Sequence, residues 1–269
     1  MKMKTEKVQL TRYIDSLQSQ GRYYFDRQQA IEATGSSYSA FRQAAYRLDK
    51  KNRIKKVLAD FFIIIPAEYV YAATLPASWF IDPLMKHLGL EYYVGLLSAA
   101  AIYGAAHQQP MLFQVVTNQV LRPISIGKMA IMFHYRKKVE PSYYAKIKTE
   151  TGQMNVAIPE VVVCDCLRYP QAAGYIQNIA TVLLELQDQL KMESLLAYIK
   201  AGNLELVNAQ RLGYLIEQLK LSIDTTPLLQ WIQEQASQYC LLVPGLSKTE
   251  RYNEKWKVVV NDDVEPDEL

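Results

Sequence analysis

Apolar residues recur at helical spacing through the first fifty residues, and short polar turns separate them. They fall at i, i+3, i+4 and i+7 in residues 7–20, which predicts a first amphipathic helix. Asp26 stands where it can cap a second helix over residues 27–33, and Gly35 can take the left-handed conformation that closes it. A third helix is predicted over residues 38–50, with a serine before it as the cap. The pattern therefore predicts three short helices joined by tight turns.

The predicted third helix has two chemically different faces. Its apolar residues follow one helical stripe and predict a small core: Phe41, Ala44, Ala45 and Leu48. The opposite face carries groups that can reach base edges and phosphates: Ser39, Arg42, Gln43, Tyr46, Arg47 and Lys50. Behind the helix, residues 53–57 and 61–65 read as a basic strand hairpin. Helix, glycine turn, helix and basic hairpin together predict a winged helix-turn-helix over residues 1–66.

This winged helix supplies the candidate DNA-binding residues. They are the polar and basic groups of the turn, the third helix and the hairpin: Ser36, Ser37, Tyr38, Ser39, Arg42, Gln43, Tyr46, Arg47, Lys50, Lys51, Arg53, Lys55 and Lys56. Of these, Arg53, Lys55 and Lys56 of the hairpin are expected to contact phosphate. The alternative is an ordinary solvated helix face. The coincidence of turn, basic face and basic hairpin favours DNA binding.

Residues 67–269 predict a larger α+β domain with a mixed sheet flanked by helices. Strand-like segments fall at 112–117, 124–126, 130–135, 154–157, 239–243 and 256–260. Helical patterns fall at 78–88, 91–107, 160–168, 175–190, 192–201, 204–219 and 227–235. The domain ends in an acidic tail. The fold class is thus α+β, with domains at 1–66 and 67–269.

Charge is distributed unevenly along the chain. The total of 30 basic and 27 acidic side chains gives only +3. Residues 1–60 hold 13 basic and 6 acidic residues, residues 61–260 hold 17 and 16, and residues 261–269 hold none and 5. A basic end indicates nucleic acid or another anionic partner. No apolar run reaches the ~18 residues of a membrane span, no secretory signal is seen, and the cysteines form no disulfide framework. A cytoplasmic location without membrane contact is expected.

The sequence contains no residue pattern typical of a catalytic, metal-binding or cofactor-binding site. The three histidines are scattered, and Cys164 and Cys166 read as buried thiols rather than metal ligands. Asp165 is expected to face solvent or cap a helix, and His107 to end one. No phosphate-binding glycine loop or nucleophile elbow occurs. No metal, no cofactor and no enzymatic activity are therefore expected.

A second group of basic residues lies in the larger domain. Seven fall between positions 122 and 148, with Glu140 as the one acid among them: Arg122, Lys128, Arg136, Lys137, Lys138, Lys146 and Lys148. One interpretation is a sheet edge protected by lysine. The other is a second nucleic-acid surface that extends the operator contact or binds RNA or a nucleotide.

Several sequence segments stand out in the middle of the chain: YYVGLLSAA at 92–100, AAHQ at 105–108 and FQVVT at 113–117. They are flanked by FIIIPAEY at 62–69, Pro159-Glu160 and DCLRY at 165–169. Together these segments resemble the AbiEi antitoxins of bacterial AbiE type IV toxin–antitoxin (abortive infection) systems. These are mostly packing residues, so they identify a family better than a site.

The resemblance implies a function that the residues alone do not give. Antitoxins of this family bind inverted repeats in their own promoter through an N-terminal winged helix and repress the operon. Their C-terminal domain counteracts an AbiEii-like nucleotidyltransferase toxin indirectly, without a tight complex. Two alternatives stay open: a C-terminal domain that is a ligand sensor or nuclease-like enzyme controlling DNA binding, and a DNA-bending protein of little sequence preference.

Overall fold

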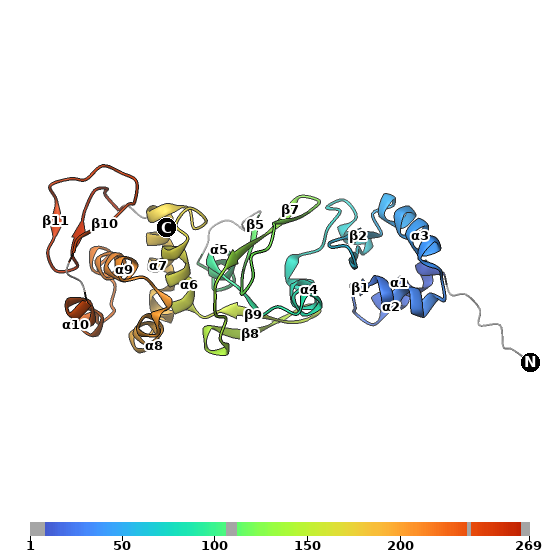
Figure 1. Cartoon of the computed structure of the whole chain (residues 1–269), viewed down its shortest axis with the longest axis horizontal. Helices are drawn as coiled ribbons and strands as arrows, with labels where there is room; N and C mark the ends of the chain where they lie inside the picture. The colour runs from blue at the N-terminus through green and yellow to red at the C-terminus, as the bar shows by residue number, and fades with distance from the viewer. Residues whose placement is uncertain (1–8, 106–111, 236–237, 265–269) are drawn as a thin grey trace, which may run out of the picture. The chain divides into compact units, whose positions relative to one another are not determined.

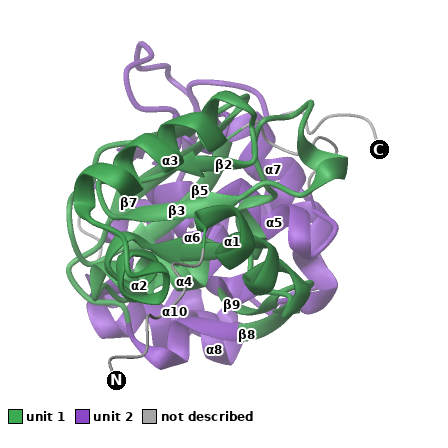
Figure 2. Cartoon of the chain, turned by 90° about the vertical axis from the view of Figure 1, so that its right-hand side faces the viewer, with its two compact units in different colours: residues 1–93, 111–139, 146–155 green, residues 94–110, 140–145, 156–269 purple. Residues whose placement is uncertain are grey.

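The computed structural model describes residues 9–105, 112–235 and 238–264. Two compact units make up the chain, and Figure 2 colours them separately. Unit 1 consists of residues 1–93, 111–139 and 146–155, and unit 2 of residues 94–110, 140–145 and 156–269.

Unit 1 begins with three helices and a small antiparallel sheet (Figure 1). The helices are α1 (Leu10–Ser19), α2 (Arg27–Thr34) and α3 (Tyr38–Lys50). The strands are β1 (Tyr24–Asp26), β2 (Ile54–Lys56) and β3 (Phe61–Ile64), in the order β1-β3-β2. These elements share one apolar core, in which Phe25 stacks on Phe62 and Phe41 meets Phe62 edge-on. The core forms because each helix turns its apolar stripe inward.

A six-stranded sheet follows, in the order β6-β7-β5-β4-β9-β8. Its strands are β4 (Tyr92–Val94), β5 (Leu112–Thr117), β6 (Ile124–Ile126), β7 (Met129–Tyr135), β8 (Tyr144–Thr149) and β9 (Gly152–Ala157). The sheet is mixed, since β5 and β7 are parallel whereas β6 and β7 are antiparallel. Before it lie two short 3-10 turns, Ala67–Tyr69 and Ala77–Trp79, and α4 (Ile81–Leu88).

Unit 2 is mainly helical. Its helices are α5 (Leu96–Ile102), α6 (Pro159–Arg168), α7 (Tyr175–Leu186), α8 (Met192–Tyr198), α9 (Leu206–Gln218) and α10 (Thr226–Gln235). A short 3-10 turn, Gln187–Gln189, follows α7, and a π-helical turn, Ile199–Asn203, follows α8. A small sheet closes the unit in the order β10 (Cys240–Leu241), β12 (Val258–Val259) and β11 (Tyr252–Asn253). Helix α6 packs against α5, α7, α8 and α9, and every side chain from Glu160 to Leu167 is buried.

The structure corrects three expectations about the larger domain. Residues 92–94 form strand β4 rather than the start of a helix over 91–107, because Val94 pairs with Val156 of β9. Strand β8 and the short strand β11 were not foreseen, since lysines interrupt the apolar pattern of β8 and β11 has two residues. The helix expected at 78–88 begins only at Ile81, after a 3-10 turn. The expected helix end at His107 lies outside the described residues.

The prediction of an α+β fold with a mixed sheet flanked by helices is confirmed. The division into domains at residues 1–66 and 67–269 stays a prediction.

Candidate nucleic-acid interface

The turn between α2 and α3 is built as the sequence suggests. Asp26 caps α2 by accepting a hydrogen bond from the Gln29 N–H at 2.8 Å. Gly35 adopts φ 58°, the left-handed conformation that ends α2 without the penalty a side chain would add. Ser37 caps α3 by accepting from the Ala40 N–H at 3.3 Å. These local hydrogen bonds fix the angle at which α3 leaves the turn.

Helix α3 separates its residues by face. Phe41, Ala45 and Leu48 are buried in the core. The opposite side exposes two rows of residues at a spacing of four, which places successive members one turn apart. The rows are Tyr38, Arg42, Tyr46 and Lys50, and Ser39, Gln43, Arg47 and Lys51, all of them exposed. The face is therefore aromatic and basic as well as polar, with Tyr46 62% exposed.

The cations on this face are mostly free of protein partners. Among the residues that the structure describes, Arg42 and Arg47 form no ion pair or side-chain hydrogen bond. Lys50 lies 5.5 Å from the centre of the Tyr46 ring, a contact that leaves its charge accessible. Arg47 and Lys51 also border a groove of about 480 Å³ beside Gln9 and Leu10. Two unpaired guanidinium groups on one exposed helix face can bind an external anion or base edge.

The basic hairpin differs from this face. Arg53 pairs with Asp15 at 2.7 Å, and Lys55 pairs with Asp49 at 3.1 Å. Lys56 is exposed and has no ion-pair partner within the described ranges. Two of the three hairpin cations already have a carboxylate partner, so a DNA phosphate would have to compete with that carboxylate for each of them. Both pairs are at least partly exposed, so each is worth at most about 1 kcal/mol, and either cation can exchange its carboxylate partner for another anion.

Sequence reasoning did not single out Arg27, which connects three parts of this module. Its guanidinium pairs with Asp60 in the hairpin turn at 2.9 Å and lies 5.2 Å from the centre of the Tyr38 ring. Its backbone N–H also donates to the Asp60 carbonyl at 2.8 Å. The only signal in the sequence was its position directly after the capping Asp26. Arg27 thus holds the start of α2, the hairpin turn and the start of α3 together.

The seven basic residues between positions 122 and 148 do not form one cluster. Strands β6 and β8 are opposite edges of the sheet, so Arg122 and Lys148 are separated by five strand spacings, about 24 Å. Lys128 and Lys137 flank opposite ends of β7, which is about 20 Å long. Lys138 and Lys146 are exposed as well. The seven residues therefore do not form a single second basic surface on the sheet.

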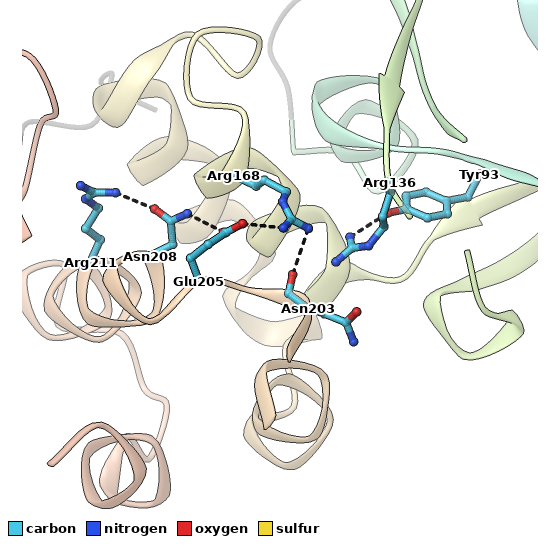
Figure 3. A network of polar contacts seen from close by, with 7 residues as sticks. All are labelled: Tyr93, Arg136, Arg168, Asn203, Glu205, Asn208 and Arg211. Carbon is cyan, nitrogen blue, oxygen red and sulfur yellow. Dashed lines mark hydrogen bonds and ion pairs between the residues drawn. The ribbon is translucent and has the colours of Figure 1, made fainter. Parts of the chain in front are cut away.

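Arg136 is the exception within that set, because it is only 4% exposed. Its guanidinium donates to the Tyr93 hydroxyl at 3.1 Å (Figure 3). The sequence run Arg136-Lys137-Lys138 suggested three surface cations, whereas only the two lysines are exposed. Arg136 is therefore a buried residue and not a surface cation.

Asp165 is buried, contrary to the expectation that it faces solvent or caps a helix. It is 1% exposed on α6, between two buried thiols. Burial, with the Asp165 carboxylate beside it, raises the pKa of the Cys166 thiol far above its ordinary value. Cys164 and Cys166 are buried as expected. In the described part of the chain, no group of three or more His, Cys, Asp and Glu side chains could hold a metal ion.

Comparison with known proteins finds a family match for the central part of the chain. Residues 93–218 match the family model of the AbiEi antitoxin C-terminal domain. The match runs from β4 to the end of α9 and confirms the resemblance to the AbiEi antitoxins. No curated protein matches the chain.

A solved structure resembles almost the whole chain. The crystal structure of the RV2827C protein from Mycobacterium tuberculosis aligns with a TM-score of 0.67 and 11% sequence identity. The alignment covers 93% of this chain and 90% of that one. At this identity the likeness shows a shared fold. Across the described residues, no helix combines the length and apolar character needed to cross a membrane.

Proposed function

With residues 93–218 belonging to the AbiEi antitoxin family, we propose that this chain is a type IV antitoxin and a repressor of its own operon. In this proposal residues 1–66 form a winged helix-turn-helix that binds inverted repeats in the promoter. Residues 67–269 counteract an AbiEii-like nucleotidyltransferase toxin without a tight complex. The role requires no catalysis, no cofactor and no membrane.

The observation that carries the DNA-binding half is the exposed face of α3. Arg42 and Arg47 project from it without a carboxylate partner in the described part of the chain, and Gln43 lies between them. Arg can bind guanine with two hydrogen bonds and Gln can do the same with adenine. Lys50, Lys51 and Lys56 would bind phosphate. A helix carried into the major groove needs this combination of base-reading and phosphate-binding groups.

The direct test is a gel shift with the chain's own promoter fragment. Arg42→Ala with Arg47→Ala is expected to weaken binding about a hundredfold or more, because each lost base contact costs about 1–3 kcal/mol. The matched control is Lys200→Ala with Lys248→Ala, which removes two exposed charges from unit 2 and is expected to leave binding unchanged. Unchanged affinity in the arginine variant would remove α3 from the interface.

The antitoxin half is tested by co-expression with a nucleotidyltransferase-like toxin, which this proposal expects to be encoded beside the chain. A chain lacking residues 1–66 is expected to rescue growth, whereas one lacking residues 67–269 is not. Failure of the shortened C-terminal chain, at normal abundance, would assign antitoxicity to repression through the N-terminal region. The absence of a toxin gene next to this one would argue against the family function itself.

The nuclease-like alternative loses its main candidate. It required accessible carboxylates around Asp165, and that side chain is buried. A sensor function is favoured by one observation in unit 2, a cavity with an arginine at its wall.

A further inference from the structure

A small cavity of about 110 Å³ lies within unit 2. Its walls come from the end of α6, the first half of α7, α9 and the segment after β10. Apolar side chains make up most of the lining, among them Leu167, Ile176, Ile179 and Leu242. The 60% exposed ring of Tyr175 is also part of the lining. The one charged residue of the lining is Arg211 on α9.

Arg211 uses only part of its hydrogen-bonding capacity within the protein. Its Nε donates to the Leu241 carbonyl at 2.9 Å, and its Nη1 donates to Asn208 Oδ1 at 2.6 Å. A guanidinium carries five N–H groups, so three of them remain, including both on Nη2. Within residues 9–105, 112–235 and 238–264, no carboxylate forms an ion pair with Arg211. The two bonds that it does make fix the orientation of the guanidinium.

The polar network behind Arg211 leaves one positive charge uncompensated (Figure 3). Arg168 pairs with Glu205 at 2.5 Å, and Asn208 donates to the other Glu205 oxygen at 3.1 Å. Asn208 then accepts the hydrogen bond from Arg211, so one carboxylate serves two guanidinium groups. Burial lowers the pKa of Arg211, because desolvation disfavours the charged form. A partly desolvated cation without a counterion is costly to keep unless an anion can join it.

We propose that this cavity binds a carboxylate carried on a small apolar body. The carboxylate would take the free N–H groups of Arg211 in a two-point contact, and the apolar body would replace water on the aliphatic walls. A carboxylate, with one negative charge, neutralises the excess of the network. A phosphate dianion would leave a net negative charge against apolar side chains, which disfavours it. The proposal is independent of DNA binding by α3, so each can fail alone.

The test is isothermal titration of the full-length protein with benzoate, with benzamide as its neutral counterpart of the same shape. Benzoate is expected to bind saturably, at least about tenfold more tightly than benzamide, because a charged hydrogen-bonded pair is lost with the amide. Phenyl phosphate is expected to bind more weakly than benzoate. Absence of saturable benzoate binding in the millimolar range, or tighter binding of phenyl phosphate, would overturn the proposal.

Two variants and a control test whether benzoate binds in this cavity, at Arg211. Arg211→Gln keeps a side-chain amide that can donate near Asn208 but removes the charge, and is expected to reduce benzoate affinity at least about tenfold. The matched control, Arg251→Gln, removes an exposed guanidinium that pairs with Asp263 outside the cavity and is expected to change nothing. Equal benzoate affinity in Arg211→Gln would contradict the assignment. If Arg211→Gln does not fold, Val243→Trp decides, because it fills the cavity while leaving Arg211 intact.

Two sources could supply such a carboxylate, a free organic acid or the C-terminal end of a protein chain. N-acetylphenylalanine, compared with N-acetylphenylalaninamide, represents the chain end. Preference for benzoate over N-acetylphenylalanine would assign the site to a small acid. The reverse preference, lost in Arg211→Gln, would assign it to a protein C-terminus.

Discussion

The two compact units carry opposite net charge. Unit 1 has 21 basic and 10 acidic residues, a net of +11, whereas unit 2 has 9 and 17, a net of −8. In unit 2, several cations form ion pairs with acids of the same unit: Arg168, Arg251, Lys255 and Lys257. In unit 1, Arg42 and Arg47 project from α3 with no such partner among the described residues. Net charge alone therefore does not show which cations are available to an external ligand, whereas the positions of their ion-pair partners do.

The largest expected effect tests whether the buried face of α3 stabilises the fold while its exposed face does not. Phe41→Ala removes a buried ring from its core and is expected to lower the free energy of unfolding by about 3–5 kcal/mol. Arg42→Ala is expected to change it by no more than about 0.5 kcal/mol. Hydrogen exchange at the α3 amides measures both effects locally. Equal destabilisation by the two variants would contradict the assignment of faces.

Unit 2 offers a stability change that should leave DNA binding alone. A Cβ at Gly213 on α9 would come within 2.2 Å of the buried Trp256 ring. Gly213→Ala is therefore expected to lower the free energy of unfolding by about 1–3 kcal/mol, although alanine favours a helix over glycine. Urea unfolding checks this, with the exposed Gln218→Ala on the same helix as control. Stabilisation by Gly213→Ala would show that Trp256 does not pack there.

The hairpin of unit 1 allows the contrast between paired and unpaired cations to be tested directly. Asp15→Asn and Asp49→Asn release Arg53 and Lys55 from their carboxylate partners. The double variant is expected to bind DNA several-fold more tightly and to steepen the salt dependence by up to about 0.9 per added phosphate contact. Fluorescence anisotropy over a range of salt concentrations measures both. An unchanged slope would place these two cations away from the phosphates.

The smallest expected effect is on the pH dependence of stability and comes from the ion pair between Arg168 and Glu205 in unit 2. Desolvation raises the pKa of Glu205, but its backbone N–H, Arg168 and Asn208 outweigh that and hold the pKa below its ordinary value. The pair therefore stabilises the fold above the ordinary pKa, and this contribution disappears as the pH falls through the lowered one. Because the pair is partly exposed, it is worth less than about 1 kcal/mol. Glu205→Gln should flatten the acid limb of stability against pH by that amount, as urea unfolding would show.

Local signals made the N-terminal elements predictable. The expected helix at 38–50 agrees with α3 residue for residue, because Ser37, Gly35 and the apolar stripe act within a few positions of one another. The prediction of a helix from residue 91 was wrong, because residues 92–94 form strand β4, whose partner β9 lies about sixty residues further along the chain. Three consecutive buried residues fit a helix or a strand equally well.

The sequence also did not predict which charged residues are buried. Nothing near Asp165 in the sequence shows that α6 is enclosed by four helices, and nothing near Arg136 shows that Tyr93 accepts its hydrogen bond. Arg211 escaped notice for the same reason, since its cavity is assembled from segments up to 77 residues apart. Such sites depend on tertiary packing, which local patterns do not encode.

We propose that the exposed face of α3, with Arg42 and Arg47, reads a specific operator. Competition for a labelled promoter fragment, by the unlabelled fragment and by a scrambled fragment of equal length at physiological salt, tests this proposal. The operator is expected to compete at a concentration about a thousandfold lower than the scrambled DNA. Equal competition by both would contradict the claim and indicate a binding surface that recognises only the charge of the DNA backbone.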